Sequence, residues 1–325
     1  MTFGESHGPA MGCVIDGCPS GIKLSVDDIR LELERRRPGA GGVSTSRIEP
    51  DEPEILSGLF EGKTLGTPIA IVVRNTGCNS ADYEHLRNVC RPGHADLSWH
   101  AKFGIRDHRG GGRSSGRETL CRVAAGAVAK KFLAGCGNGC IAIKAWVSQA
   151  AGVAVPESGG AESYANIVKA IQAEGDSAGG IVSCLVKGTP AGIGDPVFGK
   201  LDAKIAAAML SIGAVKGIEF GAGFAAAGMR GSENNDPPVS GSNHAGGVLG
   251  GISTGQDITF NVAFKPAPSI AKPQKAYDLA ADKIVDLTIG GRHDAFIPAR
   301  AVPVVEAMTA LVLADLILLQ RNAKA

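Results

Sequence analysis

The chain has 325 residues, which is enough for one large domain or two ordinary ones and for a substantial buried core. Its formal net charge of +1 excludes an overall bias toward nucleic acids or acidic membrane surfaces. Aromatic residues make up only 5%, which argues against a platform for stacking bases. The 46 glycines, about twice the usual share, predict many tight turns and close backbone approaches.

The eight cysteines contain no CxxC pair, and no histidine or cysteine pair at zinc spacing completes Cys136 and Cys140. We therefore expect no metal site and reduced thiols. No signal peptide opens the sequence, and no uninterrupted run of eighteen apolar residues appears. These features predict a soluble, cytoplasmic protein that binds neither membranes nor nucleic acids.

The first quarter of the chain predicts one helix and one strand. Because the first three residues lead directly into a glycine-containing loop, no strand is predicted before that loop. A capping sequence at Ser25 begins a helix with Ile29 on its apolar side, and Pro38 ends it. Residues 68–73, PIAIVV, form an apolar run that predicts a buried strand.

The rest of the chain mixes strands and helices. Ser115 and Glu118 have the spacing of a capping box, which predicts a helix from there to a stop near 135–139. Strands are predicted at 140–147, 180–187 and 257–264, and helices at 201–210 and 301–320, the last apolar enough to be buried. Long loops and the lack of a regular strand–helix–strand rhythm favour an α+β or α/β fold with antiparallel sheets, in one domain over 1–325.

Two segments approach nucleotide-binding motifs without completing them. Gly58 to Thr64 has three residues between its glycines where a P-loop needs four. Gly221-Ala-Gly223 is followed by Ala226 where a dinucleotide fingerprint needs its third glycine. Nucleotide hydrolysis and a Rossmann site therefore have little support.

Positive charge concentrates between Arg91 and Arg122, a stretch with six arginines and one lysine against three carboxylates. Within it, residues 110–115 read GGGRSS and precede a predicted helix, so amides, hydroxyls and a guanidinium converge on one place. From the residues alone, a solvated flexible loop is the alternative. The flanking Arg106, Arg109 and Arg117 favour an anion site, because guanidinium groups match phosphate and carboxylate oxygens.

Three further loops carry reactive side chains, although each is a weak signal alone. His7 lies in GESHG and His94 in RPGHAD, and loop histidines are usually surface residues. The neighbouring Ser6 does not make a hydrolase triad, because no nucleophile elbow is present. Residues 265–269 (KPAPS) could hold a second anion, and 290–294 (GGRHD) place a cation, an imidazole and a carboxylate together.

Together these motifs resemble the chorismate synthase family over nearly the whole chain. The strings TFGESHG, RPGHADLSW, GGGRSSGRET, SNHAGGVLGGISTGQ and GRHDAFIPARAVPVVEAM occur in the order the family has them. The resemblance implies a homotetramer whose subunit holds helices between antiparallel sheets, a β-α-β sandwich. It also implies a carbon–oxygen lyase of the shikimate pathway that uses reduced FMN. The reaction would be the 1,4-anti elimination of phosphate from 5-enolpyruvylshikimate 3-phosphate, giving chorismate for aromatic amino acid biosynthesis.

The resemblance carries roles to individual residues. His7, His94 and Asp294 would be catalytic: His7 as proton donor to the departing phosphate, His94 as a partner of the reduced flavin, and Asp294 beside the reacting flavin nitrogen, with Ser6 and Ser114 as relays. Flavin contacts are implied for Arg113, Ser114, Ser115, Gly213, Ala214, Gly250, Lys265, Pro266, Ala267, Pro268, Ser269 and Arg292. Arg36, Arg106 and Arg117 would bind substrate, and Arg36 also matches a position for reduced nicotinamide, so NADPH is a candidate reductant.

Several positions depart from the family pattern. The segment that usually precedes TFGESHG is absent, and the region after Pro156 is shorter. Gly42 stands where a basic residue is usual, Gly116 where alanine is usual, and Gly213 where an amide side chain is usual. We expect activity to be retained with weaker flavin binding. The alternatives are a flavin-binding homologue without catalysis and an oxidoreductase that consumes a nicotinamide.

Overall fold

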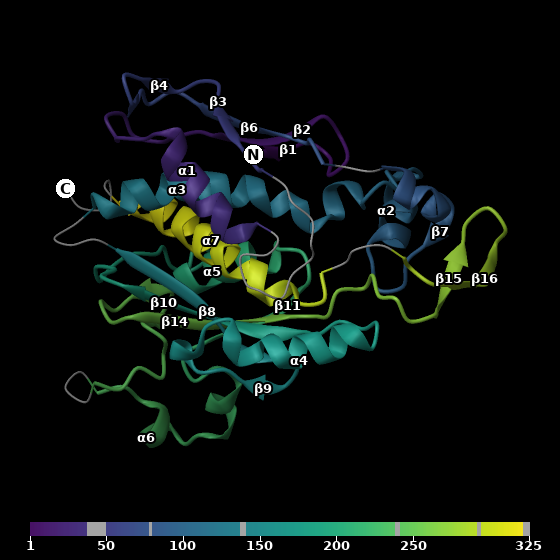
Figure 1. Cartoon of the computed structure of the whole chain (residues 1–325). Coiled ribbons are helices and arrows are strands. Elements are labelled where there is room, and N and C mark those ends of the chain that lie inside the picture. The colour runs from purple at the N-terminus through teal and green to yellow at the C-terminus, as the bar shows by residue number, and fades with distance from the viewer. Residues whose placement is uncertain (38–49, 78–79, 137–140, 238–240, 291–293, 321–325) are drawn as a thin grey trace.

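Alternating apolar residues build two antiparallel sheets, and a layer of helices fills the space between them (Figure 1). The computed structural model describes the chain except residues 38–49, 78–79, 137–140, 238–240, 291–293 and 321–325. The expected β-α-β sandwich with antiparallel sheets, and hence the α+β class, is confirmed.

The first sheet has four strands in the order β1-β2-β6-β3. Their bounds are Thr2–Phe3, Ala10–Ile15, Ile69–Arg74 and Pro53–Ile55. β6 confirms the strand predicted from the apolar run. The expectation of no strand before the first loop is wrong, because Phe3 pairs with Gly12 and the terminal amine donates to the Val14 carbonyl at 2.8 Å. Only tertiary pairing defines so short a strand. The P-loop-like segment forms a hairpin of β4 (Leu59–Phe60) and β5 (Lys63–Thr64).

The second sheet has five strands in the order β11-β14-β10-β8-β9. Their bounds are Val215–Phe220, Ile258–Phe264, Gly180–Lys187, Ala142–Ala150 and Val153–Ala154. The three predicted strands correspond to β8, β10 and β14. Every second residue of β14 is buried, so one face of this sheet packs on the helix layer. Helix α4 (Glu162–Ala173) lies on the opposite face, against β8.

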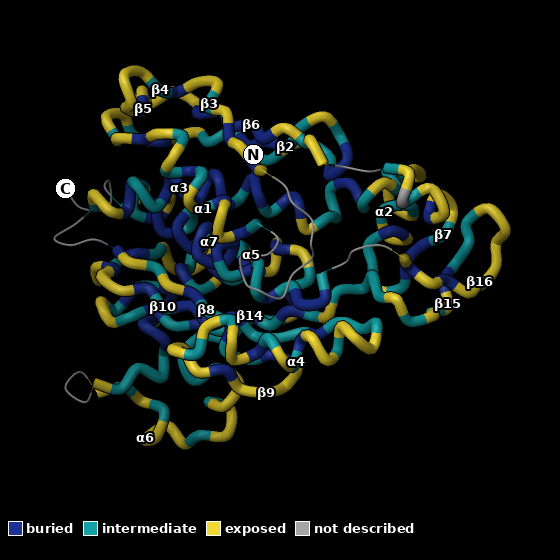
Figure 2. Tube along the Cα trace, in the orientation of Figure 1, coloured by how far each residue is buried: buried dark blue, intermediate teal, exposed yellow. Residues whose placement is uncertain are grey.

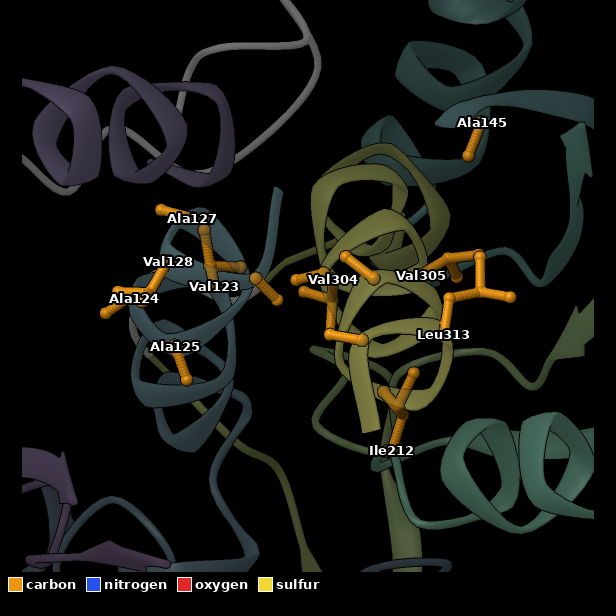
Figure 3. Packing of buried hydrophobic residues seen from close by; sticks show 14 of the residues in the cluster. Val123, Ala124, Ala125, Ala127, Val128, Ala145, Ile212, Val304, Val305 and Leu313 are labelled. Carbon is orange, nitrogen blue, oxygen red and sulfur yellow. The ribbon is translucent and has the colours of Figure 1, made fainter. Parts of the chain in front are cut away.

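Four helices form the middle layer: α1 (Val26–Arg36), α3 (Thr119–Ala134), α5 (Leu201–Leu210) and α7 (Ile297–Gln320). Figure 3 shows Val123 of α3 on the side that faces Val304 of α7. The two helices approach closely because Gly126 has no side chain, and a Cβ there would lie 2.3 Å from the Cβ of Ala307. The buried residues concentrate in this helix layer and on the sheet faces that pack against it (Figure 2).

Helix α7 contains a window of mean hydropathy 2.1, long and apolar enough to cross a membrane by composition. Charged residues such as Glu306 interrupt this helix, so it contains no uninterrupted run of eighteen apolar residues. In the structure α7 packs against α3, α5, β8 and β10. It lies between the two sheets with many of its residues buried, which confirms the prediction that this helix is buried.

The two predicted helix starts have different outcomes. Ser25 forms the expected capping box with Asp28 at the start of α1; Pro38 lies outside the described residues. The capping box at Ser115 does not form. The Ser115 hydroxyl accepts from the Arg117 amide at 3.3 Å, and a short 3₁₀ turn, η3 (Gly116–Glu118), precedes α3. Glu118 instead accepts from Oγ1 of Thr2, a tertiary partner, at 2.9 Å and from Arg122 one helical turn further along the chain.

A smaller sheet of three strands projects from one end of the sandwich (Figure 1). Its order is β16-β15-β7, with bounds Lys283–Leu287, Gln274–Asp278 and Val89–Cys90. Beside it lie η1 (Ser80–Leu86) and α2 (Asp96–Phe103). The remaining elements are η2 (Gly112–Ser114), η4 (Glu157–Gly159), η5 (Gly223–Gly228), α6 (Gly231–Asn234), β12 (Val248–Leu249) and β13 (Ile252–Ser253).

Candidate active site

A cavity of about 650 Å³ lies where the N-terminal ends of α3 and α7 meet the loop that leads into α2. It gathers residues from six separate stretches of the chain. The predicted site residues that line it are His94, Arg113, Ser114, Ser115, Arg117, Gly213, Ala214, Lys265, Ala267, Pro268, Ser269 and Asp294. His7, Arg36, Arg106, Gly250 and Pro266 are not among its lining residues, and Arg292 lies outside the described part of the chain.

Each of the three consecutive glycines of the GGGRSS motif packs against side chains from other loops. Gly110, Gly111 and Gly112 have φ of +63°, +87° and +53°, a region that disfavours side chains. A Cβ on Gly110 would lie 2.5 Å from Nε2 of His7, and one on Gly111 would lie 2.9 Å from Cε1 of His94. The motif therefore lets one backbone loop pass directly over both predicted catalytic histidines.

Replacing Gly111 with alanine is expected to displace the His94 ring and to lower kcat at least about tenfold. The strained φ alone costs on the order of 1–2 kcal/mol. Steady-state kinetics and urea denaturation measure the two effects. Gly116→Ala is the matched comparison for stability, because a Cβ there meets no heavy atom within 4 Å. Unchanged kcat in Gly111→Ala would contradict the close packing described here.

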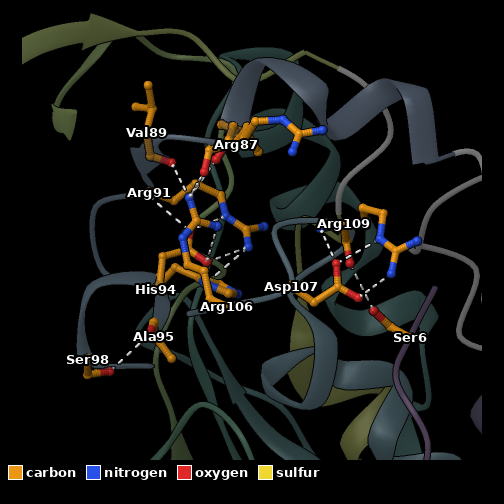
Figure 4. A network of polar contacts seen from close by, with 12 residues as sticks. Ser6, Arg87, Val89, Arg91, His94, Ala95, Ser98, Arg106, Asp107 and Arg109 are labelled. Carbon is orange, nitrogen blue, oxygen red and sulfur yellow. Dashed lines mark hydrogen bonds and ion pairs between the residues drawn. The ribbon is translucent and has the colours of Figure 1, made fainter. Parts of the chain in front are cut away.

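His94 lies in a buried cluster of charged side chains, shown with Arg91 and Arg106 in Figure 4. Its Nδ1 lies 2.9 Å from Oδ1 of Asp96, and only 12% of its side chain is exposed. Burial lowers the pKa of His94 below its ordinary value of 6.5, and Arg91 adds to this while Asp96 opposes it. The imidazole is therefore neutral at neutral pH.

Arg106 belongs to the same cluster and faces away from the cavity. Its Nη1 lies 3.5 Å from Oδ1 of Asp96, and its Nη2 donates to the backbone carbonyls of Leu86, Arg87 and Val89 at 2.5, 3.2 and 3.1 Å. The guanidinium thus holds the backbone between the end of η1 and the start of β7 in place. Its predicted contact with substrate stays a prediction.

His7 lies beneath Gly110, just behind the cavity wall, with 7% of its surface exposed. Its Nδ1 is 3.1 Å from the hydroxyl of Ser80, and its ring meets that of Tyr83 edge to face at 5.0 Å. Tyr83 itself lines the cavity. The GESHG loop thus places His7 behind the cavity lining, where it contacts two lining residues, Tyr83 and Gly110.

Asp294 immediately precedes α7 and pairs with Arg300 in the first turn of that helix. Arg300 also donates from Nε to the carbonyl of Arg36 at 3.2 Å, which links α7 to the end of α1. The other carboxylate oxygen of Asp294, Oδ1, is buried and has no hydrogen-bond partner among the residues that the structure describes. Asp294 as a residue lines the cavity, while this oxygen is buried within the cavity wall.

Two of the predicted substrate arginines share one carboxylate. Nη1 of Arg36 lies 3.4 Å from Asp51 Oδ2, and Nη1 of Arg117 lies 3.0 Å from Asp51 Oδ1. The Asp51 side chain is completely buried, and only 1% of the Arg36 side chain is exposed. One carboxylate thus binds both guanidiniums beside the cavity. Of the two arginines, Arg117 lines it.

Arg122 anchors the segment predicted to contact flavin. It donates to the hydroxyl and the carbonyl of Ser211 at 2.5 and 3.0 Å, where α5 ends and the Gly213–Ala214 turn begins. Ala214 has φ of +72° and accepts at its carbonyl from the Lys265 amide at 3.0 Å. The turn is thereby fixed between α3 and the end of β14.

Gly250 lies between β12 and β13, where a Cβ would meet no heavy atom within 4 Å. Its predicted flavin contact stays a prediction, because it is not among the residues that line this cavity.

Comparison with known proteins assigns this architecture. A model of the chorismate synthase family matches residues 1–318. The chain belongs to the chorismate synthase family. Chorismate synthase of Syntrophobacter fumaroxidans is 52% identical over 98% of this chain and 94% of its own length, and that of Methanosarcina mazei is 51% identical over 97% and 92%. A solved chorismate synthase structure matches with a TM-score of 0.76 and 31% identity over 99% of this chain and 92% of that chain.

As a member of the chorismate synthase family, this chain is a carbon–oxygen lyase. Sequence reasoning found the family through its loops but missed the residues that hold those loops in place. Asp51, Asp96, Arg122 and Arg300 each bond a predicted site residue or segment. Asp96 lies inside a quoted motif, and a carboxylate beside RPGH could have been flagged. Nothing local marks Asp51, because its partners come from distant positions.

Proposed function

We propose that this chain catalyses the reduced-FMN-dependent 1,4-anti elimination of phosphate from 5-enolpyruvylshikimate 3-phosphate, giving chorismate and phosphate. Family membership carries the proposal. The cavity supports it, because six cations and two carboxylates are among its lining side chains, a balance that suits a ligand with one phosphate and two carboxylates.

The described residues fit a bound flavin. The volume of about 650 Å³ lies in the usual range for small-molecule sites. Ser114, Ser115, the Gly213–Ala214 turn and residues 265–269 are the candidates to hold it, together with Arg113. The Arg113 guanidinium also donates to Thr2 Oγ1 and the Gly4 carbonyl at 2.7 and 3.1 Å, so the N-terminal strand helps to orient it.

When bound, reduced FMN would supply the electron density that phosphate departure needs and take it back as the hydrogen leaves, which no side-chain base can do at a carbon that is not next to a carbonyl. The chain's own residues orient and protonate. His7 is the proposed proton donor to the departing phosphate oxygen, a role worth about 10²–10⁴-fold. His94, neutral because burial lowers its pKa, is suited to form a hydrogen bond with the reduced flavin rather than to add positive charge. Asp294, which lines the cavity, is the proposed proton acceptor beside the flavin.

The decisive experiment mixes the protein anaerobically with chemically reduced FMN and 5-enolpyruvylshikimate 3-phosphate and follows chorismate and phosphate together. Equal release of both over many turnovers per flavin, without loss of reduced flavin, is expected. Net consumption of reductant for each substrate would indicate an oxidoreductase instead. Binding without chorismate would indicate the flavin-binding homologue, for which no observation speaks at present.

We also propose the finer properties that the family resemblance implies: a cytoplasmic homotetramer whose substrate is a small molecule. NADPH as a direct reductant has less support. Arg36 is buried against Asp51, and Gly42, where a basic residue is usual, lies outside the described residues. An outside source of reduced FMN is therefore the simpler proposal.

Gly213→Gln, which restores an amide side chain to the flavin segment, is expected to strengthen FMN binding. A Cβ at Gly213 meets no heavy atom within 4 Å, so the substitution has room. One added hydrogen bond is worth about 0.5–1.5 kcal/mol, which corresponds to a Kd lower by roughly 2–13-fold. Fluorescence titration with FMN measures it. Gly213→Leu is the control, because it fills the same space without an amide, and an equal gain in both variants would argue against a hydrogen bond.

A further inference from the structure

Asn75, the residue that follows β6, holds the turn that carries His7. The Gly8 amide donates to the Glu5 carbonyl at 2.9 Å and closes a β-turn over residues 5–8. His7 is a central residue of this turn. Nδ2 of Asn75 donates to the carbonyls at both ends of the turn, to Glu5 at 3.1 Å and to Gly8 at 2.8 Å. The amide side chain therefore spans the turn and fixes the backbone from which His7 projects.

The oxygen of the same amide binds an arginine of the cavity wall. Oδ1 of Asn75 accepts from Nε of Arg117 at 2.7 Å, and Arg117 lines the cavity. Nη1 of Arg117 donates to Asp51 at 3.0 Å, so Asn75 and Asp51 together fix the plane of the guanidinium. One amide side chain thus connects the turn of the proposed proton donor with an arginine of the proposed substrate site.

The chemistry of these partners requires an amide at this position. A guanidinium has donors and no acceptor, so the Asn75 oxygen must face Arg117. Backbone carbonyls only accept, so the NH₂ group must face the turn. An aspartate of the same shape would bring an acceptor against both carbonyl oxygens of the turn, and an alanine would leave all three bonds unmade. Asparagine is therefore matched to both sides of this contact.

We infer that Asn75 is a positioning residue for the proposed reaction, which holds the imidazole of His7 at a fixed place relative to the guanidinium of Arg117. The inference rests on the proposed function for its catalytic meaning, and on the hydrogen bonds alone for the contact. An anionic group of the substrate bound at Arg117 would then lie at a set distance and direction from the proton donor. A misplacement of about 1 Å can lower a rate about 10²-fold, so such a link affects turnover.

The first test needs no turnover and uses the whole protein labelled with ¹⁵N-arginine and ¹⁵N-histidine. Arg117→Lys and His7→Gln assign the Arg117 Nε–H and the His7 ring signals. The wild type is expected to show slow solvent exchange of the Arg117 Nε–H. Asn75→Ala should speed this exchange and shift the His7 signals. Asn75→Asp keeps an acceptor for Arg117 but removes both donors to the turn, so it should shift His7 while the Arg117 proton stays protected.

Two outcomes of the first test would overturn the inference. One is fast exchange of the Arg117 Nε–H in the wild type, which counts whether or not any variant folds. The other is a folded Asn75→Ala protein in which the His7 and Arg117 signals are those of the wild type.

The control variant is Asn261→Ala. Asn261 lies in β14 on the face of the second sheet that points away from the helix layer. Its amide has the same double use, since Oδ1 accepts from the Ser183 hydroxyl at 2.6 Å and Nδ2 donates to Oε1 of Glu219 at 3.1 Å. Its loss removes an amide of the same kind away from the cavity, so the His7 and Arg117 signals and kcat should stay at wild-type values.

The second test is a double-mutant cycle in kcat. Asn75→Ala is expected to lower kcat about 10-fold or more, and to raise KM for the substrate because Arg117 is also released. In a His7→Ala background the same substitution should change kcat by less than about 3-fold, since the group that Asn75 positions is gone. The rise in KM should persist there.

Equal losses of kcat in both backgrounds would show a general weakening of the fold and would sink the inference. A wild type that forms no chorismate would instead refute the proposed function, and the spectra of the first test would still decide whether Asn75 holds His7 relative to Arg117.

Discussion

His7→Ala is expected to lower kcat for chorismate formation by about 10²–10⁴-fold, the contribution of a positioned general acid. His7 is buried between Gly110 and Tyr83, and its Nδ1 bonds to Ser80, so the ring is held in one orientation. Replacement removes the proposed proton donor to phosphate. Anaerobic turnover with reduced FMN measures the effect, and binding of flavin should persist because His7 does not line the cavity.

A control separates this role from packing. His85 is an exposed residue of η1, the 3₁₀ helix that also contains Ser80 and Tyr83. His85→Ala removes its imidazole and should retain wild-type kcat. His7→Gln keeps a polar side chain of similar reach but cannot donate a proton as an acid. If His7→Gln turned over at the wild-type rate while folding normally, the acid role would be abandoned.

The elements that the sequence predicted well are those whose own apolar period decides their burial. β14 is buried at every second residue and α5 at Leu201, Ile205 and Met209, and both have the bounds expected within one residue. β1 was missed because two residues carry no period, and only pairing with β2 makes them a strand. The capping box at Ser115 failed for a related reason, since Thr2, 116 positions away, binds Glu118 together with Arg122 one helical turn further on.

The site shows the same division. Loops such as GGGRSS and RPGHAD are visible in the sequence because glycine and charge are concentrated in them. Their partners are not, because a buried ion pair joins residues that only the fold brings together. Asp51 reaches Arg117 across 66 positions, and no spacing rule predicts which carboxylate a given arginine will meet. The arginines predicted to bind substrate are also structural, and Arg36 and Arg106 are bonded to carboxylates of this chain.

Glu306→Ala is expected to cost about 3–5 kcal/mol of folding stability, because breaking a buried ion pair leaves its partners uncompensated. Glu306 lies in the middle of α7 with 4% of its side chain exposed. Arg35 of α1 donates to both its oxygens at 2.6 and 2.8 Å, Lys130 of α3 donates at 2.8 Å and the amide of Ala145 in β8 at 3.1 Å. One carboxylate thus joins three helices and the second sheet.

The pH dependence of unfolding, and a comparison with the exposed ion pair of Lys144 and Glu157, test this role of Glu306. Burial raises the pKa of Glu306, but Arg35 and Lys130 outweigh it and hold the pKa below the ordinary value of 4.5. The stabilisation is therefore present above pH 4.5 and is lost as pH falls through the lower folded-state pKa. Urea denaturation at pH 7 should show the full loss in Glu306→Ala, with the gap to wild type narrowing in acid. Glu157→Ala, which removes a pair with Lys144 that is about half exposed on both sides, should cost about 1 kcal/mol or less. Equal losses in the two variants at pH 7 would show that burial adds nothing to the Glu306 network.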